Sequence, residues 1–135
     1  MEHYALAREA FEQTRQKARE LDSPWERDAS AGLAQVALAE RDGATALREV
    51  EALLAHLAGG GTFEGAVKPR LIELTCYRVL AQAGDLRAAE LLTRAHAALQ
   101  AQGATIPDAA LRQGFLQNIP YHREIVAASS TDANR

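Results

Sequence analysis

Alanine is the residue that most constrains how this chain can fold. It occupies 29 of the 135 positions, beside 17 leucines, and supplies about half of the 47% of residues that are apolar. Alanine is the best helix former and has the smallest side chain that still carries a Cβ. Phe, Tyr and Trp together make up only 5% of the chain. The composition therefore favours helices packed closely in thin layers over a thick core built around aromatic side chains.

The spacing of apolar residues predicts six or seven helices. Small and aliphatic residues recur every three or four positions, and no alternating polar and apolar pattern of any length predicts a strand. Ser23 before Pro24 marks one start, because serine caps a helix and proline loses no hydrogen bond at the first helical position. Gly103 is expected to close another helix. The helices are expected over residues 2–21, 25–41, 44–57, 69–83, 86–102, 107–117 and 120–128.

These helices group into a single all-α domain over residues 1–128, followed by a disordered tail at 129–135. Residues 59–67, which include three consecutive glycines, are expected to form a flexible connector. The fold class expected is a short array of antiparallel helical hairpins, an α-solenoid. Its parts are an N-terminal helix (1–22), a first hairpin (24–58), the connector, a second hairpin (68–103) and a C-terminal cap (107–128).

The two hairpins also resemble each other in sequence. A shift of 42 residues places the segment 38–43 on 80–85, and each segment is followed by a helix with small or aliphatic residues at similar spacing. The matched residues are Ala46 with Ala88, Val50 with Leu92, Leu53 with Ala95, and Leu57 with Leu99. The chain then contains either a twofold repeat, in which each hairpin packs on the next, or two unrelated hairpins.

Two segments carry a resemblance to a known family. Residues 80–92, LAQAGDLRAAELL, resemble the turn of a tetratricopeptide repeat, in which Gly-Asp precedes a helix with small residues, here Ala88 and Ala89. Residues 108–125, DAALRQGFLQNIPYHREI, resemble the closing segment of tetratricopeptide-type regions at the C-terminus of large bacterial signalling ATPases, transcriptional activators and nucleotide cyclases.

This resemblance covers about residues 25–126 and is strongest from Gly84 onward. It implies a TPR-like (tetratricopeptide) helical array that binds other proteins in a bacterial, regulatory setting. The first hairpin lacks the family's Gly before the Asp of the turn, and the Gly59 tract makes the period longer than the usual 34 residues. The chain also lacks the ATPase, cyclase and DNA-binding modules that such regions accompany. It is either a free-standing repeat protein or a piece of a larger one.

Charge and cysteine content indicate the setting and the classes of partner. The formal net charge of −3 gives no basic field for nucleic acid or an anionic membrane. The apolar runs are far shorter than the ~20 residues that span a bilayer, and charged residues near the start interrupt any signal peptide. The single cysteine, Cys76, cannot form an internal disulfide. We expect a cytoplasmic location and neither nucleic-acid nor membrane partners.

Residues suited to catalysis do not gather in any recognisable pattern. The glycine tract is followed by Phe63-Glu64 rather than the Lys-Ser/Thr of a phosphate-binding loop. No two histidines stand at the i, i+4 spacing of a helical zinc site, and Cys76 lies among apolar neighbours. The histidines are His3, His56, His96 and His122. We expect no catalytic residue, no metal and no cofactor.

The helix at 69–83 carries the candidate binding residues. Its helical wheel places Arg70, Glu73, Tyr77 and Arg78 on one side, opposite the apolar stripe. Two arginines, a glutamate and a tyrosine on the concave face of an array suit a partner's carboxylate groups. The function expected is a non-catalytic protein–protein interaction module with a regulatory or scaffolding role. A homodimerising structural domain and a small helical enzyme are the alternatives.

Overall fold

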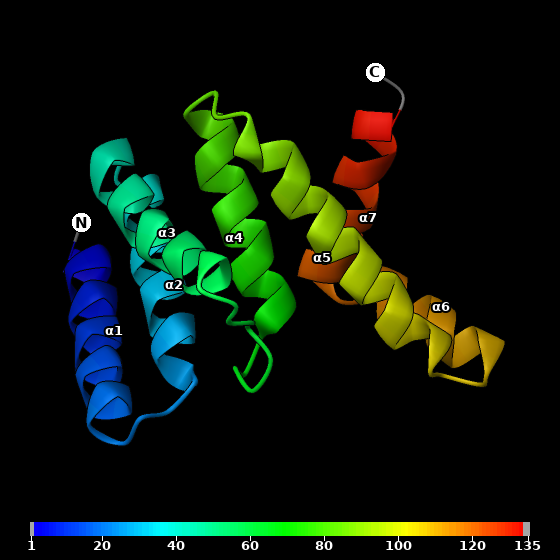
Figure 1. Ribbon diagram of the computed structural model, residues 1–135, viewed down its shortest axis with the longest axis horizontal. Coiled ribbons are helices and arrows are strands. Elements are labelled where there is room, and N and C mark those ends of the chain that lie inside the picture. Colours follow the sequence, from blue (N-terminus) through cyan, green and yellow to red (C-terminus); the bar gives the residue numbers. More distant parts are fainter. Residues whose placement is uncertain (1, 134–135) are drawn as a thin grey trace.

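A computed structural model describes residues 2–133 of the chain. Within this range it contains only helices and the turns between them, so the all-α fold class is confirmed (Figure 1). Met1, Asn134 and Arg135 lie outside the described residues. The helices are α1 (Glu2–Glu20), α2 (Trp25–Ala39), α3 (Gly43–Ala58), α4 (Pro69–Gln82), α5 (Arg87–Ala104), α6 (Ala109–Gln117) and α7 (Pro120–Ala133).

The first four helices end in the same way. After each of them, one residue has a positive φ and the next residue's N–H bonds back to a carbonyl in the last turn, which is the Schellman arrangement. The left-handed residues are Asp22 (φ 51°), Arg41 (φ 62°), Gly60 (φ 90°) and Gly84 (φ 71°).

Two helix starts are capped by aspartate side chains from the residue just before the helix. The Asp42 carboxylate accepts the Thr45 N–H (3.1 Å), and the Asp108 carboxylate accepts the Leu111 N–H (2.9 Å).

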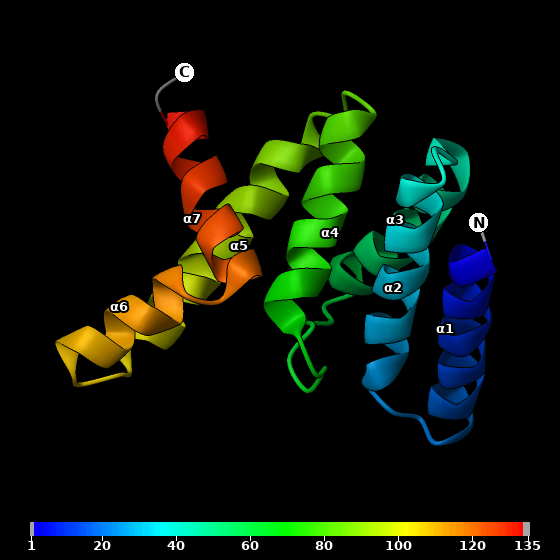
Figure 2. The same ribbon diagram turned by 180° about the vertical axis from the view of Figure 1, so that it is seen from behind.

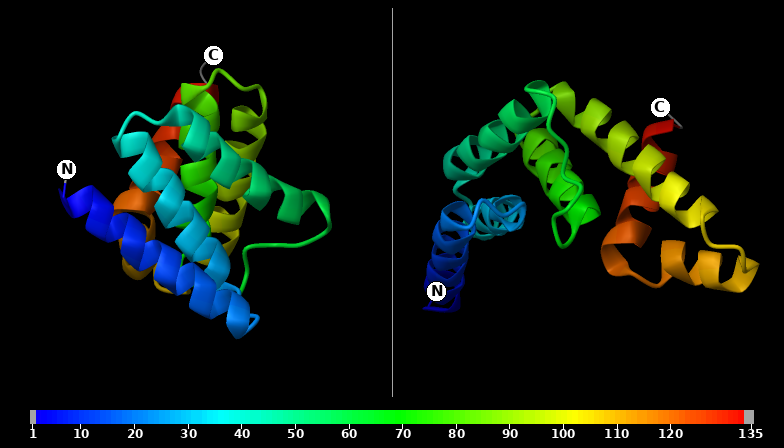
Figure 3. Two further views of the ribbon diagram at one scale, coloured as in Figure 1. Left: turned by 90° about the vertical axis from the view of Figure 1, so that its left-hand side faces the viewer. Right: turned by 60° about the horizontal axis from the view of Figure 1, so that its bottom comes forward.

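The helices are arranged in two layers. Helices α2, α4 and α7 follow one another on the face seen in Figure 2, and α3 and α5 lie on the face seen in Figure 1. Helix α1 packs along α2, and α6 contacts α5 and α7. The right-hand view of Figure 3 shows the array bent into an open arc, with α2, α4 and α7 on its inner side. We call the side formed by α1, α2, α4 and α7 the inner face.

Two apolar clusters fill the space between the layers. One joins α2, α3, α4 and the start of α5, and five of its thirteen buried residues are alanines. The other joins α4, α5 and α7 around Leu74, Leu92 and Ile125. Tyr77 contacts both clusters. Small side chains in the first cluster bring the helices close together, as the composition predicts.

The burial pattern follows the predicted repeat over most of its length. Ala46 and Ala88, Val50 and Leu92, and Leu53 and Ala95 are all buried, whereas Leu57 is half-buried and its match Leu99 is fully buried. The turns, however, match at a shift that is one residue longer than the 42 residues of the sequence match. The residue with left-handed backbone angles is Arg41 in the first turn and Gly84 in the second.

Two expectations about segment ends were wrong. Residues 129–133, expected in a disordered tail, continue α7, and the Thr131 hydroxyl donates to the Ala127 carbonyl (3.1 Å). Residues 134–135 of that tail lie outside the described residues. Gly103 lies inside α5 rather than after it. The connector at 59–67 forms no helix, and it is anchored by the buried Phe63 ring and by one hydrogen bond from the Val67 N–H to Asp28 on α2 (2.8 Å).

Candidate interaction groove

Two of the four predicted binding residues are not on the surface. Arg70 and Glu73 are 5% and 2% exposed and pair with each other, Nε to Oε1, at 2.6 Å. Their neighbours come from the connector and from α5, because the Arg70 guanidinium also contacts Glu64 (2.8 Å) and Gln102 (3.3 Å). The expected exposed face of Arg70, Glu73, Tyr77 and Arg78 is therefore wrong for its first two members.

Burial dominates the electrostatics of this buried pair. It raises the pKa of Glu73 above the ordinary value of 4.5, although the Arg70 and Arg94 guanidinium groups act in the opposite direction. Arg94 lies farther from the carboxylate than Arg70 does, with Nε at 3.7 Å. The close Arg70 Nε and Glu73 Oε1 atoms also lack hydrogen-bonding geometry. The pair joins α4 to the connector and α5 and has no open surface toward a partner.

The other two predicted residues occupy different positions. Tyr77 is half-buried between the two apolar clusters. The Arg78 side chain is 39% exposed and forms an ion pair with Glu124 on α7. Of the four residues, Arg78 is the one that lines an open groove on the inner face.

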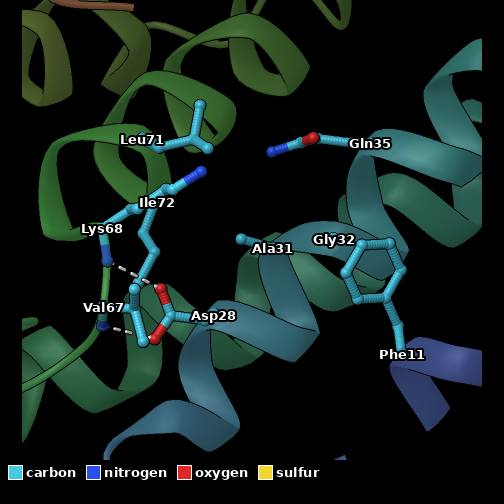
Figure 4. Close-up of a pocket in the computed structure, with 9 residues that line it drawn as sticks. All are labelled: Phe11, Asp28, Ala31, Gly32, Gln35, Val67, Lys68, Leu71 and Ile72. Atoms are coloured by element: carbon cyan, nitrogen blue, oxygen red, sulfur yellow. Dashed lines mark hydrogen bonds between the residues drawn. The ribbon is translucent and has the colours of Figure 1, made fainter. Parts of the chain in front are cut away.

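A first groove lies on the inner face between α1, α2 and α4, with a volume of about 330 Å³ (Figure 4). Its walls are mainly apolar, and the Phe11 ring stands at one end against Gly32. Both Asp28 carboxylate oxygens accept backbone N–H groups at the start of α4, from Val67 (2.8 Å) and Lys68 (3.0 Å). The lining residues are Phe11, Asp28, Ala31, Gly32, Gln35, Val67, Lys68, Leu71 and Ile72.

A second groove of about 620 Å³ lies between α4 and α7. It shares Leu71 with the first groove, so the two adjoin across α4. The Arg78–Glu124 ion pair lies along it. Its lining residues are Leu71, Arg78, Pro120, Tyr121, Arg123, Glu124 and Ala127. We call the two together the inner groove.

Outside the inner groove, the Cys76 thiol and the His56 and His122 rings, which could act in catalysis, are buried or held by backbone carbonyl groups. Burial raises the pKa of the Cys76 thiol to about 12, which disfavours the nucleophilic thiolate. The His122 ring lies 2.8 Å (Nδ1) from the Phe115 carbonyl, and the His56 ring lies 2.8 Å (Nε2) from the Thr62 carbonyl. Among residues 2–133, no three His, Cys, Asp or Glu side chains gather closely enough to hold a metal ion. Nor is any described helix long and apolar enough to cross a bilayer.

The architecture so far defines an all-α array of packed neighbouring helices. In comparisons with known proteins, the chain matches no family model, no curated protein and no solved structure.

Sequence reasoning missed most of the inner groove. Phe11, Gly32, Lys68, Leu71 and Arg123 were not predicted to come together, because they belong to four different helices and one loop end. One local signal was available. Gly32 interrupts a helix of good helix formers, and a glycine there has a cost unless another group approaches the backbone closely.

Proposed function

We propose that this chain is a non-catalytic protein–protein interaction module that binds a segment of a partner along its inner groove, in a regulatory or scaffolding role. The observation that carries the proposal is the junction of two open grooves at Leu71, on the inner side of the arc. Together they border α1, α2, α4 and α7, with Leu71 between them, and a peptide segment that crosses Leu71 would reach both. The tetratricopeptide resemblance of residues 80–92 and 108–125 supports the same reading.

The surfaces of the groove suit recognition of side chains. Apolar groups from Phe11, Val67, Leu71 and Tyr121 are only partly covered, and each is bordered by polar or charged groups. A partner's apolar side chains would remove this area from water at about 25 cal/mol per Å². Charged groups at the rim would then fix register and select the partner.

The test is a selection of peptides from a random displayed library against the folded protein. Peptides recovered would be labelled and titrated by fluorescence anisotropy against three proteins: wild type, Leu71→Arg and Leu86→Arg. Leu71 lies at the junction of the grooves, whereas Leu86 is 96% exposed and lines neither groove. The Leu86→Arg variant therefore adds the same charge in a place that the proposal does not use.

We expect Leu71→Arg to weaken binding at least tenfold, or roughly 1.4 kcal/mol, and Leu86→Arg to leave it within about twofold. Circular dichroism would confirm that both variants stay helical. Failure to recover any peptide, or equal binding to all three proteins, would overturn the proposal. Light scattering on the wild type tests the alternative, because a stable homodimer disrupted by Leu71→Arg would assign the groove to a second copy of the chain.

A further inference from the structure

The charged residues of the inner groove are not balanced. The groove is lined by two carboxylates, Asp28 and Glu124, and by three cations, Lys68, Arg78 and Arg123. Both oxygens of Asp28 are engaged by backbone N–H groups, and Glu124 is paired with Arg78. Each carboxylate in the groove therefore already has its partner.

Two of the cations have none. Lys68 and Arg123 are exposed, and neither forms an ion pair with any residue that the structure describes. Lys68 lines the first groove and Arg123 the second. Figure 4 shows the Lys68 side chain extending along the first groove between Leu71 and Gln35. Each groove thus contains one cation without an ion-pair partner, and the two grooves together hold three cations and two carboxylates, whereas the whole chain has a formal net charge of −3.

From this charge pattern we infer that the partner segment is an acidic peptide that also carries a bulky apolar side chain, an inference that rests on the proposed function. Its carboxylates would accept charge-assisted hydrogen bonds from Lys68 and Arg123, which satisfy cations that the protein itself leaves free. Its apolar side chain would lie in the first groove between Phe11 and Leu71. A basic segment would meet two unpaired like charges and would be rejected.

The chain offers clean variants for this inference. The Lys68 side chain can be changed without losing the Asp28 interaction, because Asp28 binds the Lys68 backbone N–H. Lys68→Gln with Arg123→Gln removes two positive charges from the groove. Lys17→Gln with Arg48→Gln removes two from exposed positions that line neither groove, so both double variants have the same net charge.

The experiment measures peptides from the selection whose binding depends on Leu71. We expect them to be enriched in Asp and Glu, to bind the groove double variant at least tenfold more weakly and to bind the control double variant within about twofold of wild type. Lys68→Glu with Arg123→Glu should reverse the preference, so that versions of the peptides with Lys in place of Asp and Glu bind better.

The outcomes separate the inference from the proposed function. Leu71-dependent peptides that lack acidic residues and ignore Lys68 and Arg123 would overturn the inference and leave the interaction module standing. Equal weakening by both double variants would also overturn it, because the effect would then be diffuse electrostatics. Single-stranded oligo-dT, an anion without apolar side chains, should not compete with the peptides, and competition would assign the two cations to phosphate.

Discussion

The Phe11 ring on α1 lies directly against the backbone of Gly32 on α2. A Cβ built on Gly32 would come within 2.4–2.6 Å of three ring atoms, far inside van der Waals contact. We therefore expect Gly32→Ala to push the ring away, loosen α1 from α2 and lower the free energy of unfolding by about 1–3 kcal/mol. Urea unfolding followed by circular dichroism measures the loss.

Gly43 is the matched control for this substitution. It also lies in a helix, but nothing stands within 4 Å of the Cβ that alanine would add. Gly43→Ala should therefore leave stability unchanged or raise it by up to about 1 kcal/mol, because alanine has the better helix propensity. If the two substitutions have the same effect, the contact between Phe11 and Gly32 does not hold α1 in place.

The turns after α2 and α4 differ in the residue at the left-handed position. Arg41 adopts φ 62° where Gly84 adopts φ 71°. A residue with a Cβ is strained at such angles by roughly 1–2 kcal/mol, whereas glycine is not. We expect Arg41→Gly to raise the melting temperature and Gly84→Ala to lower it, each by about 3–5 °C. Differential scanning calorimetry tests the pair, and shifts of the same sign would contradict it.

The helices were predictable because their ends are marked locally. Asp42 and Asp108 cap helices, and glycine or aspartate follows the last turns, so short stretches of sequence are enough to find most boundaries. The end of α7 was missed because serine and threonine at 129–131 suggest a frayed end, although Val126 and Ala128 pack against the second apolar cluster and hold the helix.

The site could not be predicted in the same way. A helical wheel shows which residues of α4 share a side, but not which neighbouring helix covers that side. Helix α4 packs against α2, α3, α5 and α7, so only a narrow strip of it stays open. Arg70 and Glu73 face α5 and the connector, whereas Leu71, which was not among the predicted binding residues, lies where the two parts of the inner groove meet.

The contrast between Arg70 and Arg78 leads to a prediction about stability. Arg70→Met would leave the buried Glu73 carboxylate with only the more exposed Arg94, whose Nε lies 3.7 Å away, at a cost of about 3–5 kcal/mol. Arg78→Met breaks an ion pair whose side chains are 39% and 46% exposed, which should cost about 0–1 kcal/mol. Urea unfolding of both variants measures this difference in the free energy of unfolding. Similar losses in the two variants would mean that the buried Glu73 carboxylate does not depend on its ion pair with Arg70.

A double substitution checks the cause of that loss. Arg70→Met with Glu73→Leu removes both buried charges and replaces them with apolar groups, so it should cost less than Arg70→Met alone. A larger loss in the double variant would mean that packing around Arg70, rather than the unpaired Glu73 carboxylate, explains the effect.

The raised pKa of Glu73 predicts how stability depends on pH. Because the folded protein binds a proton at Glu73 more tightly than the unfolded chain does, this residue contributes stability below its ordinary pKa of 4.5. That contribution is lost as the pH rises through the raised pKa. Glu73→Gln has no such proton to lose. The stability of wild type relative to Glu73→Gln should therefore fall as the pH rises above 4.5, in urea unfolding measured at several pH values.

Asp85 provides the opposite sign as a control. Hydrogen bonds from the Arg87 side chain and backbone lower the pKa of this half-buried carboxyl from 3.8 to about 2. Asp85 therefore contributes stability above pH 3.8 and loses it as the pH falls toward about 2. Relative to Asp85→Asn, the wild type should become more stable as the pH rises through this lower window, and change little above it.

The opposite result at Glu73 would contradict the prediction made for that residue. If wild type gains stability over Glu73→Gln above pH 4.5, the ion pair with Arg70 outweighs the burial of the carboxylate.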